Sequence, residues 1–518
     1  MRKFNILYLV VIVLITACSG SKKLTQAKKS FSIGEYTRAA ELYKKAYAKE
    51  KNRYYKGEYA WYMGESYRIT NKPLKAASAY SKAVRYEYPE REAQFYMAES
   101  YRKAGKLDKA IPEYEEYLEK VPADIRAQRG LASCMMLQKE PQPNRYIIAK
   151  EKDLNSKYSD YSPTYAGTEF DYVVFASMRV EGKSKRKNRI TGQGTSSIFY
   201  SKKNAKGAWE DPAPFEEPIN NPKFDDGSPF VSHDGKELFF TRCKFDNEKP
   251  TGAEVVSCKR QGGQWGEPIN ASLALDSTLL DSTVIAHPAL SADGETLYFV
   301  SDMEGGYGGK DIWKAEKAGE GQWGEPINMG SAINTPGNEM FPFIRKDGIL
   351  YFSSDTHIGF GGLDLFKAEL NEEGNWDVTN MGEPINSIGD DFGIVFQGKD
   401  EVGLFSSSRG STKGIDNIYS FVLPKLNFYL TGLITNNNEE IVTGSYLRLI
   451  GSDGTTMKVK SPSDGKFKVK LKPNTDYVFL VAAEGYLNKK VKFSTSGEVN
   501  DKSFEYNIVM EKPLQKVN

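Results

Sequence analysis

The sequence predicts a multidomain protein of the mixed α and all-β class, with an α-solenoid, a five-bladed β-propeller and a C-terminal β-sandwich. Three observations lead to this prediction. Apolar residues keep helical spacing from Leu24 to Gln138, in a pattern that repeats every 34 to 37 residues. Short aromatic-rich strands and Asp-Gly turns then recur at intervals of 50 to 58 residues as far as Phe421. A different pattern of alternating strands follows Pro424, and 518 residues are enough for three such domains.

The first segment has the pattern of an export signal. Arg2 and Lys3 precede an apolar run at residues 6–15, which is too short to span a bilayer. The run ends in Leu14-Ile-Thr-Ala-Cys18, and small residues directly before a cysteine resemble a bacterial lipoprotein signal. The resemblance implies that Cys18 is the lipidated residue and that lipid anchors the protein in the outer membrane, at its periplasmic face. A plain cleaved secretory signal is the alternative.

Residues 24–140 resemble tetratricopeptide repeats. Equivalent residues recur in three repeats, at the ends of the first helices, in the turns, and in the middle of the second helices (Phe31, Tyr67, Tyr101; Gly34, Asn71, Gly105; Tyr43, Tyr80, Tyr114). A capping helix is expected at residues 126–138. The resemblance implies a surface that binds extended segments or partner helices. We expect the tyrosines to lie mainly in the core, and the basic cluster of Arg102, Lys103, Lys106 and Lys109 to be a solvated face.

The best copy of the propeller unit lies between His287 and Asn328. Asp293-Gly294 predicts a hairpin turn, because glycine accepts a positive φ without a Cβ clash. Residues 297–301 and 311–314 are short aromatic-rich strands, and residues 323–328 supply an outer edge. The unit is therefore a four-stranded antiparallel sheet of the size of a propeller blade.

Five copies of this unit fit between Tyr161 and Phe421. An Ile-Asn dipeptide marks the ends of the blades (Ile219-Asn220, Ile269-Asn270, Ile327-Asn328, Ile385-Asn386). The last copy lacks an outer strand, whereas residues 154–161 resemble residues 385–392. We therefore expect residues 146–155 to supply the missing strand, so that residues 144–423 form a WD40-like (PD40) propeller without a free edge.

Residues 426–511 predict about seven alternating strands. The segment resembles the carboxypeptidase regulatory-like, transthyretin-like β-sandwich, in which Asp464-Gly465-Lys-Phe467 is similar to the family's internal hairpin. The resemblance implies an accessory domain, of a kind that is rarely catalytic.

A search for catalytic residues finds no convincing set. Propellers of this repeat type also occur in prolyl peptidases, but the chain has no G-x-S-x-G and no segment in which strands and helices alternate. His233, His287 and His357 fall at different positions in three blades, and neither H-x-x-H nor C-x-x-C occurs. We therefore predict no enzyme, no catalytic residue, no metal and no cofactor. A net charge of +2 gives no reason to expect nucleic acid as a partner.

Three recurring aspartates leave two interpretations open. Asp311, Asp364 and Asp416 each follow closely on a glycine at matching places in three blades. The favoured interpretation is that each accepts backbone N–H bonds from its own turn. The alternative is a ring of carboxylates at one face, which binds Ca²⁺ or a basic partner.

The basic loop and the internal cysteines carry weaker signals. Loop 181–194 holds Lys183, Lys185, Arg186, Lys187 and Arg189. It either contacts anionic headgroups, lipopolysaccharide or a partner, or is a solvated, mobile loop. Cys134 is expected to be a small buried residue. Cys243 and Cys258 lie at opposite ends of one predicted hairpin, which disfavours a disulfide.

The order of the domains resembles the PorE-type and OmpA-family periplasmic lipoproteins of Bacteroidota. This resemblance implies an association with type IX secretion or gliding, and partners such as a PorP/SprF-like outer-membrane barrel or other components of the secretion system. Those relatives end in an OmpA-like domain that binds peptidoglycan, and no such segment follows residue 511 here, so we expect only indirect contact with peptidoglycan.

The sequence therefore favours a non-catalytic scaffold for protein–protein contacts in an envelope assembly. The alternative is a surface-exposed lipoprotein whose propeller binds glycan or peptide. An open solenoid surface lined with aromatic and polar side chains would favour the scaffold. Exposed aromatic residues clustered on one face of the propeller would favour the alternative, because sugars stack on such platforms.

Overall fold

The computed structural model describes residues 23–139, 144–179, 194–246, 249–275, 283–411 and 414–513. The chain divides into two compact units, residues 1–423 and 424–518. The predicted signal with Cys18 and the five basic residues of the predicted 181–194 loop lie outside the described residues. No helix in the described ranges is long and apolar enough to cross a membrane.

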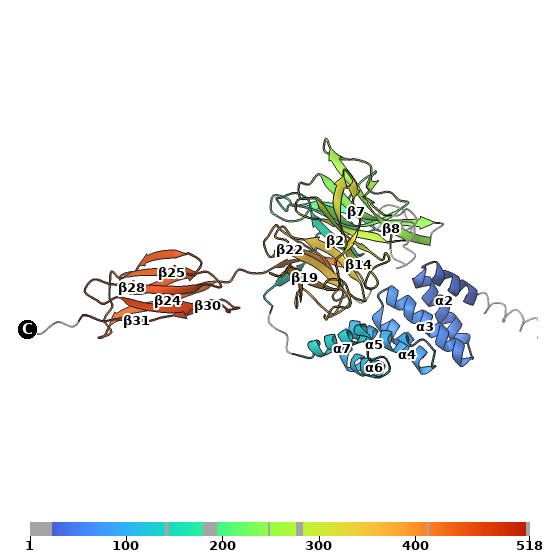
Figure 1. The fold of residues 1–518 in the computed structure, drawn as a ribbon, viewed down its shortest axis with the longest axis horizontal. Coiled ribbons are helices and arrows are strands. Elements are labelled where there is room, and N and C mark those ends of the chain that lie inside the picture. Colours follow the sequence, from blue (N-terminus) through green and yellow to red (C-terminus); the bar gives the residue numbers. More distant parts are fainter. Residues whose placement is uncertain are drawn as a thin grey trace, which may run out of the picture. The chain divides into compact units, whose positions relative to one another are not determined.

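The first unit begins with a row of helices in which each packs against the next (Figure 1). The row consists of residues 23–32 and six longer helices: α2 (Tyr36–Lys49), α3 (Arg53–Ile69), α4 (Pro73–Arg85), α5 (Glu92–Lys103), α6 (Leu107–Lys120) and α7 (Ile125–Leu137). Alanines at the contacts let the helices approach closely, and the tyrosines at the centre of the second helices are fully buried (Tyr43, Tyr80, Tyr114). Left-handed residues lie in the three turns where the sequence predicts them (Gly34, Asn71, Gly105).

Five sheets follow in the described residues, with antiparallel pairing throughout except between β11 and β15 of the third, and we refer to residues 147–422 as the ring. The first sheet contains β2 (Asp160–Tyr165), β3 (Tyr172–Ser177), β4 (Ser197–Lys202) and β5 (Ala213–Pro214). The second contains β6 (Asp225–Val231), β7 (Glu237–Asp246), β8 (Lys249–Gln261), β9 (Gln264–Trp265) and β10 (Ile269–Asn270). The third contains β11 (Ser272–Leu273), β12 (Ile285–Leu290), β13 (Thr296–Ser301), β14 (Asp311–Gly319), β15 (Gln322–Trp323) and β16 (Ile327–Asn328).

The last two sheets complete the ring. The fourth contains β17 (Glu339–Ile344), β18 (Leu350–Ser354), β19 (Asp364–Leu370) and β20 (Trp376–Asn380). The fifth contains β21 (Asp391–Phe396), β22 (Val402–Ser407), β23 (Asn417–Val422) and β1 (Ile147–Lys150). β1 precedes every other strand in the chain, yet it pairs with β23, the last strand of the ring. Residues before the first sheet thus form the outer strand of the fifth.

The innermost strands close a cycle around the axis. Each of β2, β6, β12, β17 and β21 contacts the next, and β21 contacts β2. All five strands contain a bulge at which one residue has a positive φ (Ser162, Ser228, His287, Phe341, Gly393). Because a bulge bends a strand and increases its twist, this shared irregularity lets five sheets turn around a common axis.

The four predicted Ile-Asn dipeptides occupy two different kinds of position in the sheets. In Ile219-Asn220 and Ile385-Asn386 the isoleucine is buried, and the asparagine bonds both the N–H and the C=O of the sheet's third strand. Ile333-Asn334 has this same role. By contrast, Ile269 and Ile327 are more than half exposed and lie in short outer strands. The prediction that Ile269-Asn270 and Ile327-Asn328 are equivalent in position to the other two dipeptides is therefore wrong.

As far as residue 513, the second unit has eight strands in two sheets. One sheet contains β25 (Tyr446–Gly451), β26 (Thr456–Lys460), β28 (Asp476–Ala482) and β29 (Lys489–Ser494). The other contains β24 (Phe428–Asn436), β27 (Lys466–Leu471), β30 (Lys502–Glu505) and β31 (Ile508–Met510). Both contribute to one apolar core. The Asp464-Gly465 turn joins β26 to β27, which belong to different sheets, so the predicted internal hairpin is wrong.

Candidate functional site

His287 and His357 have structural roles in the ring, whereas His233 lines a cavity of 140 Å³. The ring of His287 stacks on Phe341 with centroids 3.9 Å apart, and burial lowers the pKa of His287 to about 3. His357 Nε2 donates to the Ile333 carbonyl at 2.9 Å. No group of three His, Cys, Asp or Glu side chains in the described residues could hold a metal ion. Cys134, Cys243 and Cys258 are all free.

Two of the three recurring aspartates accept bonds from their own turns. Asp311 Oδ2 accepts from the Tyr307 N–H at 2.6 Å. Asp364 Oδ2 accepts from the N–H groups of Phe360 and Gly361, at 2.8 and 3.0 Å. Burial raises the pKa of Asp364 to about 8. Asp416 differs, because its backbone N–H donates to Ser159 Oγ.

The helical repeats contain a polar triad that occurs twice. The tetrapeptide Glu-Ser-Tyr-Arg stands at residues 65–68 and again at 99–102, 34 residues later. In each copy the glutamate pairs with the arginine one turn on and accepts a hydrogen bond from the tyrosine of the following helix (Glu65, Arg68, Tyr80; Glu99, Arg102, Tyr114). A search for this exact repeat in the sequence could have found the triad.

The two copies of the triad differ in exposure. The Arg68 side chain is 36% exposed, whereas Arg102 is 3% exposed. The prediction that the basic cluster around Arg102 is a solvated face is therefore wrong for Arg102. Burial would raise the pKa of Glu99, but the charges of Arg102 and Lys103 hold that pKa at about 2.

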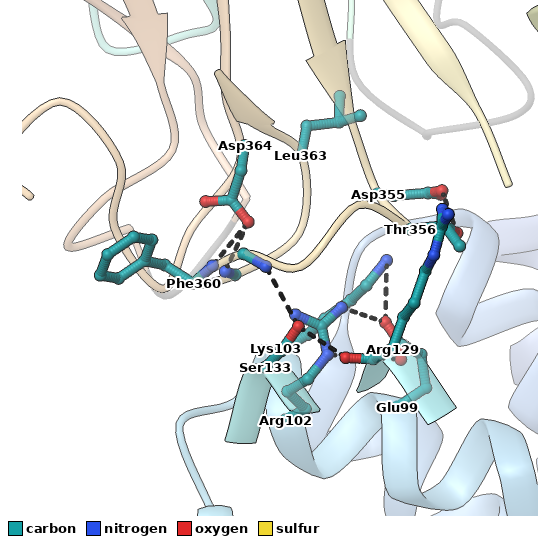
Figure 2. Close-up of polar contacts among 12 residues, drawn as sticks. Glu99, Arg102, Lys103, Arg129, Ser133, Asp355, Thr356, Phe360, Leu363 and Asp364 are labelled. Atoms are coloured by element: carbon teal, nitrogen blue, oxygen red, sulfur yellow. Dashed lines mark hydrogen bonds and ion pairs between the residues drawn. The ribbon is translucent and has the colours of Figure 1, made fainter. Parts of the chain in front are cut away.

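Arg102 is buried because the ring lies against this end of the helical repeats. Figure 2 shows Glu99, Arg102 and Lys103 of α5, and Ser133 of α7, beneath the ring segment that carries Phe360 and Asp364. The Gly359 N–H donates to Ser133 Oγ at 3.1 Å. A second contact joins the Asn71 amide to the Asp390 carboxylate. Positions 359 and 361 are glycines, and a Cβ on either would lie within 2.5 Å of other atoms of the ring, those of Asp364 and of residues 387–389.

A cavity remains between the helical repeats and the ring, and we call it the junction cavity. Its volume is 250 Å³. The helices contribute five basic side chains to its lining (Arg68, Lys72, Arg102, Lys103, Arg126), together with Phe95, Tyr96 and Glu99. The ring contributes mainly neutral polar groups, with Asp355 as its one acidic side chain in the described lining. The cavity thus has aromatic and cationic walls on one side and polar walls on the other.

A line of packed aromatic rings leads from the surface of the helical repeats to this cavity. We call it the aromatic ladder, and its members in order are Tyr55, Tyr54, Tyr88, Trp61 and Tyr96. Successive ring centroids lie 5.6 to 6.4 Å apart. Tyr54 and Tyr55 are 53% and 48% exposed, while Tyr96 lines the cavity and carries the Arg68 guanidinium 4.5 Å above its ring.

The fourth sheet, which faces the cavity, differs from the first and fifth sheets. In the first and fifth sheets a buried aspartate at the start of the innermost strand pairs with an arginine (Asp160 with Arg179, Asp391 with Arg409). Glu339 holds the equivalent register in the fourth sheet, and Thr356 stands where the arginine would be. Without a cation partner, burial raises the pKa of Glu339 to about 8, so this carboxyl is neutral at pH 7.

The axis of the ring is narrow. A cavity of 40 Å³ lies there, lined by residues from the innermost strands, and none of its lining residues is an aspartate or glutamate. Ser-Pro, His-Pro and Phe-Pro dipeptides at the bulges fill the space. A larger cavity of 140 Å³ lies at the ends of four innermost strands, and its described lining also holds no aspartate or glutamate.

Comparison with known proteins identifies the helical region. The family model of the tetratricopeptide repeat matches residues 63–125 and 95–142. This confirms that the helices form tetratricopeptide repeats, a class of domain that mediates protein–protein interactions. A search of curated proteins gives no match.

Solved structures give only distant likenesses. The endo-arabinase of Bacteroides thetaiotaomicron is 13% identical, over 53% of this chain and 98% of that chain, with a TM-score of 0.36. An exo-β-1,3-galactanase of Clostridium thermocellum is 13% identical, over 68% and 82%, with a TM-score of 0.37. A chlorocatechol 1,2-dioxygenase of Pseudomonas putida is 11% identical, and this chain spans 61% of it with a TM-score of 0.15. These values support no statement about activity.

Proposed function

We propose that this chain is a non-catalytic lipoprotein that acts as a protein–protein scaffold in an envelope assembly. Lipid on Cys18 would anchor it in the outer membrane at the periplasmic face, as the signal pattern at residues 1–18 suggests. The assembly that we favour is related to type IX secretion or gliding. Its partners would be outer-membrane proteins such as a PorP/SprF-like barrel.

The aromatic ladder is the observation that carries this proposal. Its outer members, Tyr54 and Tyr55, are about half exposed and already packed against neighbouring rings. Such pre-ordered aromatic side chains lose little conformational entropy on binding, and they are enriched in protein interfaces. Because tetratricopeptide repeats bind partners through their helical surface, this end of the repeats is the best candidate for a partner site.

We also propose the finer assignments of the two β-rich parts. The ring would be a five-bladed propeller of the WD40-like type, which five sheets with a closed cycle of innermost strands support. The second unit would be an accessory transthyretin-like sandwich, supported by two sheets around one core. In this proposal both parts serve as spacers and contact surfaces.

The absence of catalysis remains part of the proposal. Hydrolysis of glycosidic bonds normally needs two carboxylates on either side of the bond. The axial cavity has no carboxylate in its described lining. Within the ring, the carboxyl groups of Glu339 and Asp364 are buried and bonded to nearby N–H or hydroxyl groups. These observations support a binding role over a hydrolytic one.

The alternative is a surface lipoprotein whose ring binds glycan or peptide. A stacking platform for sugars needs several exposed aromatic residues on one face. Among the described residues of the ring, Tyr307 is the one large aromatic side chain that is about half exposed. This distribution favours the scaffold.

Crosslinking in the native envelope tests the proposal. The tagged protein would be crosslinked, extracted and captured beside two variants, Cys18→Ala and the double variant Tyr54→Ala with Tyr55→Ala. We expect an outer-membrane barrel or secretion components with the wild type, and reduced recovery with both variants. A matched control is Tyr446→Ala, which changes a tyrosine of similar exposure in the second unit. Equal recovery with all variants, or a tag accessible on intact cells, would favour the surface-binding alternative.

A further inference from the structure

One face of the second unit carries positive charge that no ion pair neutralises. In the sheet of β25, β26, β28 and β29, alternate residues point into the core and the others form an outer face. Five exposed cations stand on this outer face, which we call the basic face (Arg448, Lys458, Lys460, Lys490, Lys492). The ion pairs in the described part of this unit involve three other lysines, Lys472, Lys489 and Lys502.

The register of the strands brings the five cations together. Arg448 of β25 is opposite Lys458 on one side and Leu480 on the other, and Leu480 is opposite Lys490. One row across the four strands therefore contains three cations, and it is about 14 Å wide, because neighbouring strands lie about 4.8 Å apart. The other two cations lie in the adjacent rows, on the edge strands of the sheet (Lys460 on β26, Lys492 on β29).

Acidic residues are scarce on the basic face. Among the residues of its four strands, Asp476 is the one acidic side chain, and it lies at the end of β28, opposite Ser494. Asp453 and Glu484 lie in the turns between the strands, and Asp453 already pairs with Lys472. The half-buried side chains between the cations are apolar (Ile450, Val478, Leu480). The basic face thus has an apolar centre with cations on both sides.

Protection of the sheet edges does not account for the whole pattern. Lysines on edge strands keep two sheets from pairing, and four of the five cations lie on the edge strands β26 and β29. Arg448, however, lies on β25, which has a strand on either side. Its positive charge in the middle of the sheet has no protective role and extends the charge of the two edges into one surface.

The kind of cation indicates what this surface binds. Lysine is a strongly hydrated point charge on a flexible stem, whereas the planar fork of arginine fits a carboxylate in a fixed position. Four lysines and one arginine therefore suit mobile phosphate groups better than the fixed carboxylates of a protein partner. A broad sheet surface with an apolar centre also matches a membrane surface, where apolar side chains reach the boundary of the headgroup layer.

We propose that the basic face binds the anionic phospholipid headgroups of the membrane in which lipid on Cys18 would anchor the chain. The cations attract the headgroup phosphates, and the apolar centre rests against the headgroup layer. A lipid chain and a basic surface together hold a protein at a membrane more firmly than either does alone. This inference rests on the proposed membrane anchor and adds a contact that depends on no partner protein.

Flotation of vesicles with bound protein tests the inference. The protein is the chain of residues 19–518, which lacks the predicted signal and the lipidated residue, so that binding reports the protein surface alone. The vesicles contain phosphatidylcholine alone, or phosphatidylcholine with about one third phosphatidylglycerol. We expect binding to the anionic vesicles only. Salt at about 1 M should release the protein, because it screens charges beyond about 3 Å.

Two triple variants with the same change in charge locate the binding surface. The first alters the basic face (Lys458→Gln, Lys490→Gln, Lys492→Gln), and the control alters exposed lysines of β27 in the other sheet (Lys466→Gln, Lys468→Gln, Lys470→Gln). Each lysine at a membrane surface contributes about fivefold, so the first variant should bind about a hundredfold more weakly. The control should stay within about threefold, because the two outer faces lie further apart than the range of charges in about 0.1 M salt, about 10 Å. Circular dichroism checks that both variants are folded.

Several results would overturn the inference. Equal loss in both variants would show that the overall charge binds the vesicles, and no loss in either would assign binding to another segment, such as loop 181–194. Equal binding to phosphatidylcholine alone would remove the role of anionic headgroups. No binding to anionic vesicles would favour an acidic protein as the partner of the basic face. Failure of the proposed scaffold function looks different, because the vesicles would still bind while crosslinking captures no envelope partner.

Discussion

The neutral carboxyl of Glu339 should make the stability of the ring depend on pH. Glu339 is fully buried, and its oxygens accept bonds from Ser354 Oγ, Thr335 Oγ1 and the Thr335 N–H, at 2.6 to 2.7 Å. No lysine or arginine pairs with it in the described part of the chain. Replacement by glutamine keeps the shape and removes the titration, and its NH2 group can donate to the Thr335 and Ser354 hydroxyls while its oxygen accepts from the Thr335 N–H. Glu339→Gln therefore mimics the neutral acid at every pH.

The sign and size of the effect follow from the raised pKa. The native state binds a proton at Glu339 up to a pKa of about 8, whereas the unfolded chain loses it near the ordinary value of 4.5. The contribution of the neutral Glu339 side chain to the free energy of unfolding is therefore fully present below pH 4.5 and is lost as the pH rises to 8. The difference between these two pKa values corresponds to about 5 kcal/mol. The free energy of unfolding should fall by about 4 kcal/mol more in the wild type than in Glu339→Gln between pH 5 and 9.

Guanidinium unfolding followed by tryptophan fluorescence measures this difference. Five of the six tryptophans lie in the ring, and Trp61→Phe in both proteins removes the signal of the helical repeats. Glu369→Gln is the matched control, because Glu369 lies in the same sheet with a 45% exposed side chain. The free energy of unfolding of Glu369→Gln should change with pH in the same way as that of the wild type. If the free energies of unfolding of the wild type and Glu339→Gln also change equally from pH 5 to 9, Glu339 is ionised in the native state and the reasoning fails.

Three further predictions concern other parts of the chain. Gly130→Ala should lower the free energy of unfolding of the helical repeats by about 1 to 3 kcal/mol, measured by circular dichroism, because the new Cβ would lie 2.5 Å from the buried Tyr114 ring. Arg409→Gln should destabilise the ring by about 3 to 5 kcal/mol, measured by tryptophan fluorescence, because it leaves Asp391 buried without a cation. Cys18→Ala should move the protein from the membrane fraction to the soluble fraction, as seen by immunoblot.

Each of these predictions has a matched control. Met135→Ala changes an exposed side chain of the same helix as Gly130 and should cost less than about 0.5 kcal/mol. Lys367→Gln breaks an exposed ion pair of the ring and should have a similarly small effect, about 0.5 kcal/mol. Cys134→Ala changes a buried cysteine and should leave the protein in the membrane fraction. A control as damaging as its partner variant, or a Cys18→Ala protein that stays with the membrane, would contradict the corresponding prediction.

The parts of the fold that depend on local chemistry could be predicted from the sequence. The helical repeats were found because apolar spacing and residues that adopt left-handed φ, such as Gly34 and Asn71, are set within one or two turns of the chain. The outer strand from residues 146–155 was expected because residues 154–161 repeat residues 385–392, and β1 pairs with β23. In both cases the prediction depends on residues that are close in the sequence or on a segment that is repeated in it.

The parts that depend on distant packing could not be predicted in the same way. The same Ile-Asn dipeptide begins at residue 219 and at residue 269, yet Ile219 is buried and Ile269 is exposed. The burial of Arg102 depends on the ring segment near residue 359, which lies more than 250 positions away in the sequence. The candidate site was missed for this reason, because its walls come from two domains that the sequence presents separately.

The twin Glu-Ser-Tyr-Arg triads show how one repeated pattern can take two roles. At Arg102 the ring covers the triad, so its charge is confined within the protein and is balanced by Glu99. At Arg68 the same triad stays open and its guanidinium stacks on Tyr96, in the wall of the junction cavity. The ring therefore covers the triad of one repeat and leaves that of the other partly exposed. A scaffold built in this way would fix the position of its own ring and its partner along a single row of helices.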